Sequence, residues 1–204
     1  MAQKIGHKPR KEMIAETKGK LIAAARRAFA TRGYAEASMD DFTAEAGLTR
    51  GALYHHFGDK KGLLQAVIAE IDAEMSDRLC AISAKAENAW RGFVDESVAY
   101  IEMALEPEIQ RIMLLDGPAV LGDPSQWPNQ NACIRTTTAS IQKLIDEGTI
   151  RKVDAEATAR LVNGATLSAA LWIAGAEDPQ AVSKKAVEAF NAMISGLLKE
   201  KAPA

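Results

Sequence analysis

The stretch from residue 38 to residue 64 constrains the fold most, because it carries the start and stop signals of two short helices in immediate succession. Ser38 and Asp41 are spaced as at a helix N-terminus, where the serine oxygen accepts a hydrogen bond from an unpaired amide and the carboxylate favours the positive helix end. A helix is therefore predicted to begin near Met39. Gly47 marks its end, since glycine readily takes the positive φ of a sharp turn.

A second short helix is predicted directly after this turn. Thr49 offers an N-cap for a helix that starts at Arg50. Leu53 and Phe57 are four residues apart and face the core, whereas Arg50, Tyr54 and His55 fall on or beside the opposite face. One face anchors the helix and the other is free to enter a DNA groove. This arrangement is typical of a helix-turn-helix.

Residues 15 to 65 resemble the DNA-binding domain of the TetR (tetracycline repressor) family of bacterial regulators. The residues that carry the resemblance are Gly33, Tyr34, Asp41, Ala46, Gly47, Thr49, Gly51, Leu53, Tyr54, His56, Phe57, Lys60, Leu63 and Leu64. Phe42 and Thr43 depart from the family, which commonly has a smaller aliphatic residue followed by alanine. If Thr43 packs against the next helix, its bulk shifts the angle between the two helices. Beyond residue 65 only the helical layout is similar, so the resemblance implies no particular ligand.

Most of the candidate DNA-contacting residues lie on the second helix and at the start of the following one, and Ser38 and Thr43 belong to the first helix and its cap. Arg50 can donate a bidentate hydrogen bond to O6 and N7 of guanine, with a phosphate contact as the alternative. Gly51 and Ala52 allow close approach to the groove, and Lys60 attracts a phosphate. The full predicted set is Ser38, Thr43, Thr49, Arg50, Gly51, Ala52, Tyr54, His55, His56 and Lys60. For its polar members the alternative is an ordinary solvated side chain.

A length of 204 residues suits two domains, which the helical patterns along the chain predict to be all-α, and the charge is divided unevenly between them. The net charge of −2 over 204 residues argues by itself against nucleic acid. Residues 1–61 nevertheless carry twelve Lys or Arg and seven Asp or Glu, which gives this segment a net charge of +5. The remainder carries thirteen Lys or Arg and twenty Asp or Glu, which gives it a net charge of −7. A basic segment is what phosphate contact requires.

The predicted domains follow this division. They are a flexible basic arm at 1–12, a three-helix helix-turn-helix domain at 13–61, and a larger helical ligand-binding and dimerisation domain at 62–204. The first helix is expected from about Thr17 to Thr31. For the arm, minor-groove contact and a disordered or tag-derived tail are the open alternatives.

The larger domain shows further helical patterns. A long helix from residue 60 has apolar residues every three or four positions to residue 82 and would link both domains. Helices are also expected at about 87–105 and 129–147, with a short one ending near residue 115. The Gly- and Pro-rich segment 117–128 is predicted to be a loop beside a pocket or a lid.

Two final helices, at about 154–174 and from residue 179, are rich in small and apolar residues that allow close helix approach. Asp178 and Pro179 form an N-cap followed by proline at the first helical position. The resemblance implies that both helices pair with their copies in a homodimer, and packing within one chain is the alternative. A twofold protein places two reading helices about 34 Å apart and therefore implies a palindromic operator.

Bulky apolar side chains of the larger domain would line a cavity for a small apolar or aromatic ligand if they converge, with core packing as the alternative. These residues are Trp90, Phe93, Tyr100, Met103, Met113, Trp127 and Trp172. By resemblance, ligand binding would release the DNA. This requires the ligand to favour the state that does not bind DNA.

No pattern indicates an enzyme, a metal site or a cofactor. His55 and His56 are adjacent and point about 100° apart on a helix, so they do not form the facing pair that a metal needs. Cys80 and Cys133 have no CxxC-type spacing and are predicted to be reduced core residues, with redox sensing as the alternative. With no signal-like start and no apolar run near ~20 residues, the chain is expected in the cytoplasm.

The sequence thus predicts a homodimeric transcriptional repressor that a small molecule releases from DNA. One alternative is a regulator that answers to a protein partner or acts as an activator. The others are a pure ligand-binding module and an enzyme.

Overall fold

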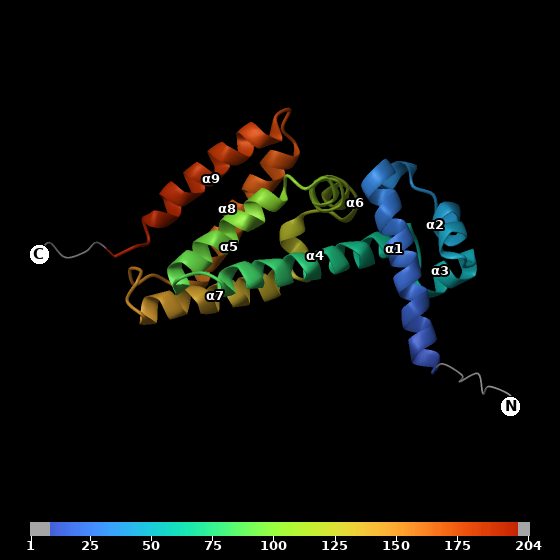
Figure 1. Ribbon diagram of the computed structural model, residues 1–204, viewed down its shortest axis with the longest axis horizontal. Helices are drawn as coiled ribbons and strands as arrows, with labels where there is room; N and C mark the ends of the chain where they lie inside the picture. The colour runs from blue at the N-terminus through green and yellow to red at the C-terminus, as the bar shows by residue number, and fades with distance from the viewer. Residues whose placement is uncertain (1–8, 200–204) are drawn as a thin grey trace, which may run out of the picture. The chain divides into compact units, whose positions relative to one another are not determined.

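The computed structural model describes residues 9–199, and their regular structure is helical (Figure 1). Within this range the sole strand-like feature is an isolated antiparallel bridge between Ile150 and Leu198. The all-α prediction is therefore confirmed. The chain divides into two compact units, and the division falls between Glu70 and Ile71, inside helix α4 (Lys60–Ala84). None of the helices in the described range is both long and apolar enough to cross a membrane.

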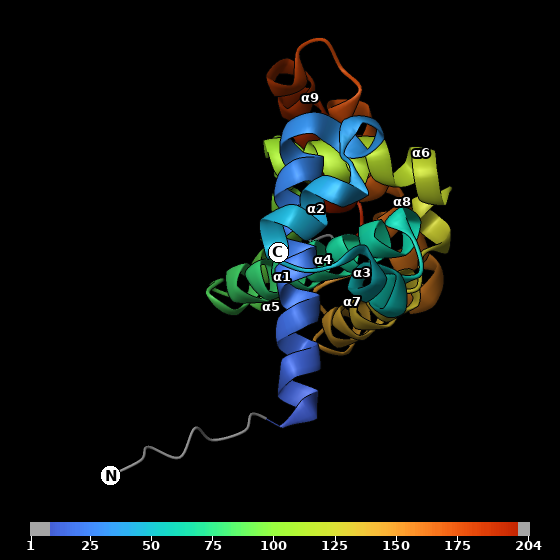
Figure 2. The ribbon, with the colours of Figure 1, turned by 90° about the vertical axis from the view of Figure 1, so that its right-hand side faces the viewer.

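The first unit contains three helices that contact one another, followed by the first turns of α4 (Figure 2). The three are α1 (Arg10–Glu36), α2 (Met39–Ala46) and α3 (Arg50–Phe57). Phe29 of α1 and Phe42 of α2 are fully buried, and their ring centres lie 5.3 Å apart in an edge-to-face arrangement. Both α2 and α3 begin at the residues that the sequence predicted.

The start of α1 differs from the prediction. The helix begins at Arg10 instead of about Thr17, and residues 1–8 of the predicted arm lie outside the described residues. The added turns are mostly exposed and are held by local contacts such as the ion pair between Glu16 and Lys20 (3.0 Å). Because these turns have no buried face, their sequence has no periodic apolar residues that would indicate a helix. At the other end Gly33 leaves the helical conformation (φ 81°, ψ 165°), close to the predicted end.

The second unit comprises the rest of α4 and a set of helices, most of which contact α8. They are α5 (Ala89–Met103), the π-helix η1 (Ile109–Asp116), α6 (Gly117–Leu121), the 3-10 helix η2 (Pro124–Gln126), α7 (Gln130–Asp146), α8 (Ala155–Ala174) and α9 (Pro179–Ser195). Helix α8 lies against α5, α7, α9 and η1 (Figure 1). Its buried positions include Ala159, Val162 and Ala170, whose short side chains let these neighbours approach closely.

The segment 117–128 is not the loop that the sequence predicted, because it contains α6 and η2. Pro124 lies in the first turn of η2, where the missing N–H removes no helical hydrogen bond. Pro118 lies in the first turn of α6, which follows η1 without a break. Gly122 ends α6 with a φ of 88°, and its carbonyl oxygen accepts a hydrogen bond from the Trp127 indole (3.2 Å). Gly122 therefore marks the end of α6, and Pro124 marks the start of η2.

Candidate nucleic-acid interface

Helix α2, the turn and helix α3 are joined by local hydrogen bonds. Ser38 Oγ accepts from the backbone amides of Asp40 (3.1 Å) and Asp41 (3.3 Å). Gly47 is left-handed, with φ 65° and ψ 33°. Thr49 Oγ1 accepts from the amide at the third position of the next helix, at 3.3 Å. These contacts end one helix and begin the other as the sequence predicted, which orients α3 relative to α2.

Helix α3 has one buried and one exposed face. Leu53 is fully buried, whereas Tyr54 is 53% exposed. The other predicted DNA-contacting residues on this helix are the exposed Arg50, Gly51 and His55 and the half-buried Ala52 and His56. The exposed side chains of α3 thus present a guanidinium, a phenol and an imidazole to solvent. Such groups bind phosphate oxygens and base edges.

Arg50 and Asp40 form an ion pair across the turn. Nε and Nη2 of Arg50 donate to Oδ1 and Oδ2 of Asp40, respectively, and the two side chains are 61% and 60% exposed. The hydrogen bonds from Arg50 lower the pKa of the Asp40 carboxyl below its ordinary value. Sequence reasoning missed Asp40, because contact between residues ten positions apart depends on the angle between α2 and α3.

Lys60 begins α4 as predicted, and its side chain also has a structural contact. Nζ donates a hydrogen bond to the carbonyl oxygen of Ala35, 3.2 Å away. The contact joins the start of α4 to the connection between α1 and α2. A phosphate at this position would meet an ammonium group whose location is already restricted.

Thr43 does not reach the surface that was predicted to contact DNA. Its side chain is only 5% exposed, and its hydroxyl donates to the carbonyl oxygens of Met39 (3.2 Å) and Asp40 (3.1 Å). Threonine hydroxyls inside helices commonly bond back to the preceding turn in this way. The prediction for Thr43 is therefore corrected, because this residue belongs to the core of the first unit.

The two adjacent histidines lie side by side, with ring centres 5.1 Å apart. Partial loss of contact with water lowers the pKa of His56, and the charges of His55 and Lys18 add to the effect. Both effects favour the neutral form of the His56 imidazole. Among residues 9–199, no group of three or more His, Cys, Asp or Glu is arranged to hold a metal ion.

The residues predicted to line a ligand cavity take different positions in the second unit. Phe93, Met103 and Met113 are buried, and Trp90, Tyr100 and Trp127 are half-buried. The structure brings Trp90 and Phe93 together, with ring centres 6.3 Å apart. Trp172, by contrast, is 55% exposed on α8. It is therefore not part of the interior of a single chain.

Several ionisable side chains of the second unit are partly or largely buried, and sequence reasoning missed Asp72 and Glu96 among them. Cys133 was predicted in the core and is half-buried, whereas the same prediction is wrong for Cys80, which is exposed. Asp72 Oδ2 accepts a hydrogen bond from Asn129 Nδ2 (2.8 Å). Burial raises the pKa of Asp72, Glu96 and Cys133. It raises that of Tyr100 to about 12, with smaller contributions from Cys133 and Asp72. Asp72 lies on α4 and Glu96 on α5, so no local pattern signals their burial, and they make the interior less apolar than predicted.

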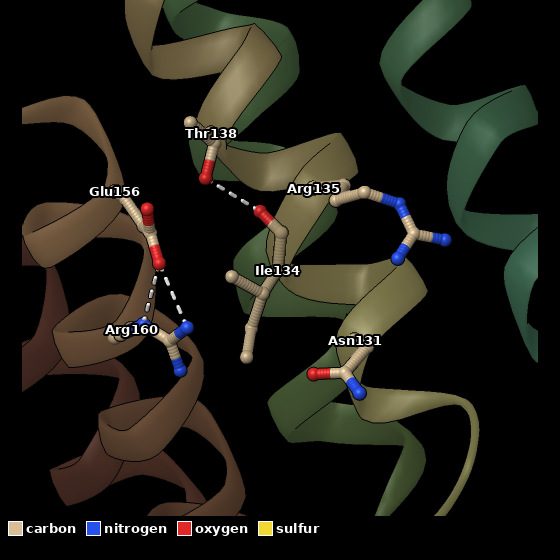
Figure 3. A pocket seen from close by; sticks show the side chains of 6 residues that line it. All are labelled: Asn131, Ile134, Arg135, Thr138, Glu156 and Arg160. Carbon is tan, nitrogen blue, oxygen red and sulfur yellow. Dashed lines mark hydrogen bonds and ion pairs between the residues drawn. The ribbon is translucent and has the colours of Figure 1, made fainter.

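A surface pocket of about 310 Å³ lies between α7 and α8 (Figure 3). Its lining consists of Asn131, Ile134, Arg135 and Thr138 from α7 and of Glu156 and Arg160 from α8. Oε1 of Glu156 accepts hydrogen bonds from Nε (3.0 Å) and Nη2 (2.7 Å) of Arg160, which neutralises this guanidinium. The lining is mainly polar and includes none of the residues predicted to contact a ligand, so this pocket is not the predicted apolar cavity.

Comparisons with known proteins agree with this architecture. Residues 21–67 match the family model of bacterial regulatory proteins of the tetR family, and residues 90–197 match that of the tetracyclin repressor-like C-terminal domain. The crystal structure of a TetR-family transcriptional regulator from Pectobacterium atrosepticum has 51% sequence identity to this chain. The match covers 95% of this chain and 99% of that one, with a TM-score of 0.88.

Two further relatives share shorter regions. The HTH-type transcriptional regulator TtgR of Pseudomonas putida is 42% identical over 73 residues, which are 36% of this chain and 34% of TtgR. The HTH-type transcriptional repressor AcnR of Corynebacterium glutamicum is 28% identical over 136 residues, which are 64% of this chain and 67% of AcnR. The match to TtgR thus spans about a third of that protein.

Proposed function

Because the chain belongs to the TetR family of bacterial regulatory proteins and is a helix-turn-helix transcriptional regulator, we propose that it is a homodimeric repressor that leaves a palindromic operator when a small molecule binds its C-terminal domain, residues 62–204. The observation that carries the DNA-binding part is the exposed face of α3, with Arg50 at its first position and Leu53 anchoring it from behind. The similarity to the repressor AcnR supports the sign of regulation.

The proposed DNA contacts divide into base reading and phosphate binding. Arg50 reads a guanine, because a guanidinium matches its O6 and N7 atoms. Phosphate contacts from Tyr54 and Lys60 fix the register of α3 without reading sequence. The complete proposed set is Ser38, Thr49, Arg50, Gly51, Ala52, Tyr54, His55, His56 and Lys60. Thr43 is left out because it is buried.

Helices α8 and α9 form the proposed dimer contact. Leu161 and Trp172 of α8 and Met193 of α9 are 74%, 55% and 56% exposed. Gly164 and Ser168 are also exposed on α8 and leave room for a second helix. Large apolar side chains on neighbouring exposed helices favour association, and a twofold copy would cover them with the same surface. Such a dimer holds two α3 helices about one DNA turn, roughly 34 Å, apart.

Ligand response is proposed for the interior of the second unit. The proposed ligand contacts are the buried and half-buried Trp90, Phe93, Tyr100, Met103, Met113 and Trp127. Trp172 belongs to the proposed dimer contact instead. The ligand acts by binding better to the form that does not bind DNA, and a difference of about 1.4 kcal/mol weakens the operator complex tenfold.

Selection of genomic DNA fragments tests this function. The purified wild type is compared with Arg50→Ala at near-physiological salt, and with Arg27→Ala as a control, because Arg27 is an exposed arginine of α1 that pairs with Glu45. We expect the wild type and the control to retain a palindromic site. Arg50→Ala loses about 1–3 kcal/mol of affinity for it and relaxes specificity at one base pair per half-site. Indiscriminate retention of fragments by the wild type, or retention of none, contradicts the proposal.

A further inference from the structure

We propose that Asp40 is a specificity-determining residue of the DNA interface, because it holds the Arg50 guanidinium so that only the outer edge of this group faces a base. The inference rests on the proposed function and adds to it a residue that does not itself touch a guanine. Asp40 lies in the first turn of α2 and Arg50 at the first position of α3, so their ion pair spans the turn between the two helices.

The geometry of the pair leaves the base-reading edge of Arg50 open. Asp40 accepts from Nε and Nη2, which form the inner edge of the guanidinium. A guanidinium has five N–H groups in one plane, so Nη1 and the second N–H of Nη2 remain on the outer edge. Two parallel donors on one edge match the O6 and N7 acceptors of guanine. Asp40 thus fixes the plane of the group while leaving its fork free.

The charge of Asp40 also separates base reading from phosphate binding. An unpaired arginine at this position would be drawn to any phosphate, and phosphate contacts add affinity without sequence information. A carboxylate bonded to the guanidinium neutralises much of that attraction and is itself repelled by the DNA backbone. Asp40 therefore lowers the affinity for random DNA while it preserves the contact with guanine.

A role in folding stability does not account for the pair. Both side chains are about 60% exposed, and ion pairs with this exposure contribute little to stability. Helix α2 carries a comparable pair, in which Glu45 Oε1 accepts from Nε and Nη2 of Arg27 (2.7 and 2.6 Å). That pair joins α2 to α1 and involves no residue of α3. Glu45 is therefore a matched control for the loss of one acidic charge from α2.

The test uses the full-length protein with the operator found by fragment selection and with operator variants changed at the base pair that Arg50 reads. The proteins are the wild type, Asp40→Asn, Asp40→Ala, Glu45→Gln, Arg50→Ala and the double variant Asp40→Ala/Arg50→Ala. Affinities for the operator, its variants and random duplex are measured over a range of salt concentrations. Thermal unfolding of each protein reports on the fold.

We expect both Asp40 variants to bind random duplex more tightly, with a salt dependence steeper by about one counterion. Their preference for the wild-type base pair falls roughly tenfold, which corresponds to about 1.4 kcal/mol. Glu45→Gln changes the salt dependence and keeps this preference. In the Arg50→Ala background, removal of Asp40 changes no base preference.

Two results overturn the assignment of Asp40 and leave the proposed function standing. In the first, the wild type selects an operator and the Asp40 variants keep the full base preference of the wild type. In the second, replacement of Asp40 changes the base preference even when Arg50 is absent. A wild type that selects no site overturns the proposed function and this assignment together. The two failures are therefore distinguishable.

Discussion

The ammonium group of Lys60 lies 4.4 Å from the centre of the Tyr34 ring, close enough for a cation–π contact. The same group bonds to the Ala35 carbonyl, so Lys60 stabilises the first unit as well as offering a charge to DNA. Burial, with the charge of Asp59, raises the pKa of the Tyr34 phenol. The ring therefore stays neutral and able to attract the cation throughout the physiological pH range.

Replacement of Lys60 is expected to separate these two roles. Lys60→Met keeps a long stem over Tyr34 and removes the charge, so it should weaken binding to every duplex alike and reduce the salt slope by about one. Both Lys60→Met and Lys60→Ala should also lower the free energy of unfolding by about 1 kcal/mol, because either change removes the ammonium group that contacts Tyr34 and Ala35. Thermal unfolding and salt titrations measure both effects, with the exposed Lys61→Ala as the stability control. If the Lys60 variants lost affinity for the operator and kept their affinity for other duplexes, Lys60 would be assigned to base reading instead.

Two glycine substitutions are expected to change stability in opposite directions. Gly47→Ala forces a side chain into a backbone with φ 65° and should cost about 1 kcal/mol, although nothing lies within 4 Å of the added Cβ. Gly19→Ala lies inside α1, also with nothing within 4 Å, and should stabilise by about 0.5–1 kcal/mol. Chemical denaturation of the two variants measures both. Equal effects would contradict the assignment of a conformational role to Gly47.

Leu161→Glu is expected to yield monomers, because it places a charge at a position of α8 that is 74% exposed and that we assign to the dimer contact. Sedimentation analysis would show the change. Operator affinity should fall at least tenfold, because a monomer binds DNA with one α3 helix and a dimer with two linked ones. Leu115→Glu is the control, because Leu115 is 41% exposed on η1, outside α8 and α9. A dimer that survives Leu161→Glu and dissociates with Leu115→Glu would relocate the interface.

Stability is expected to fall in alkaline solution through Tyr100. Burial raises the pKa of Tyr100 from 10.0 to about 12, so the folded protein holds its proton more tightly than the unfolded chain. The corresponding stability is fully present below pH 10.0 and is lost as the pH rises through about 12. Denaturant unfolding at a series of pH values should show this decline in the wild type and a smaller one in Tyr100→Phe. Identical declines would mean that other groups cause it.

The local signals in the sequence predicted the DNA-binding unit well. Ser38, Gly47 and Thr49 act on amides or torsions within a few residues of themselves, so their roles follow from spacing alone. Contacts between different helices, by contrast, did not follow from spacing. Thr43 was expected at the surface, yet its burial depends on how α2 packs, and the pairing of Asp40 with Arg50 depends on the angle across the turn.

The second unit was predictable as a series of helices and less so as a site. The apolar periods gave α5, α7, α8 and α9 to within a few residues. The partly buried Asp72 and Glu96 were not foreseen, because a charged side chain on a helix has the same local sequence whether it faces solvent or neighbouring helices. Their environment is set by contacts among α4, α5 and α7.

The left-handed turn at Gly47 has a consequence for how this regulator can acquire new operators. The residue that sets the turn makes no proposed base contact, and Arg50, Gly51 and Ala52 are outside the buried core. Folding and sequence preference therefore reside on separate positions of one short segment. A library randomised at residues 50–52 and held constant at Gly47 and Leu53 should yield mostly folded proteins with diverse target sites, so this segment is a natural starting point for evolving orthogonal genetic switches.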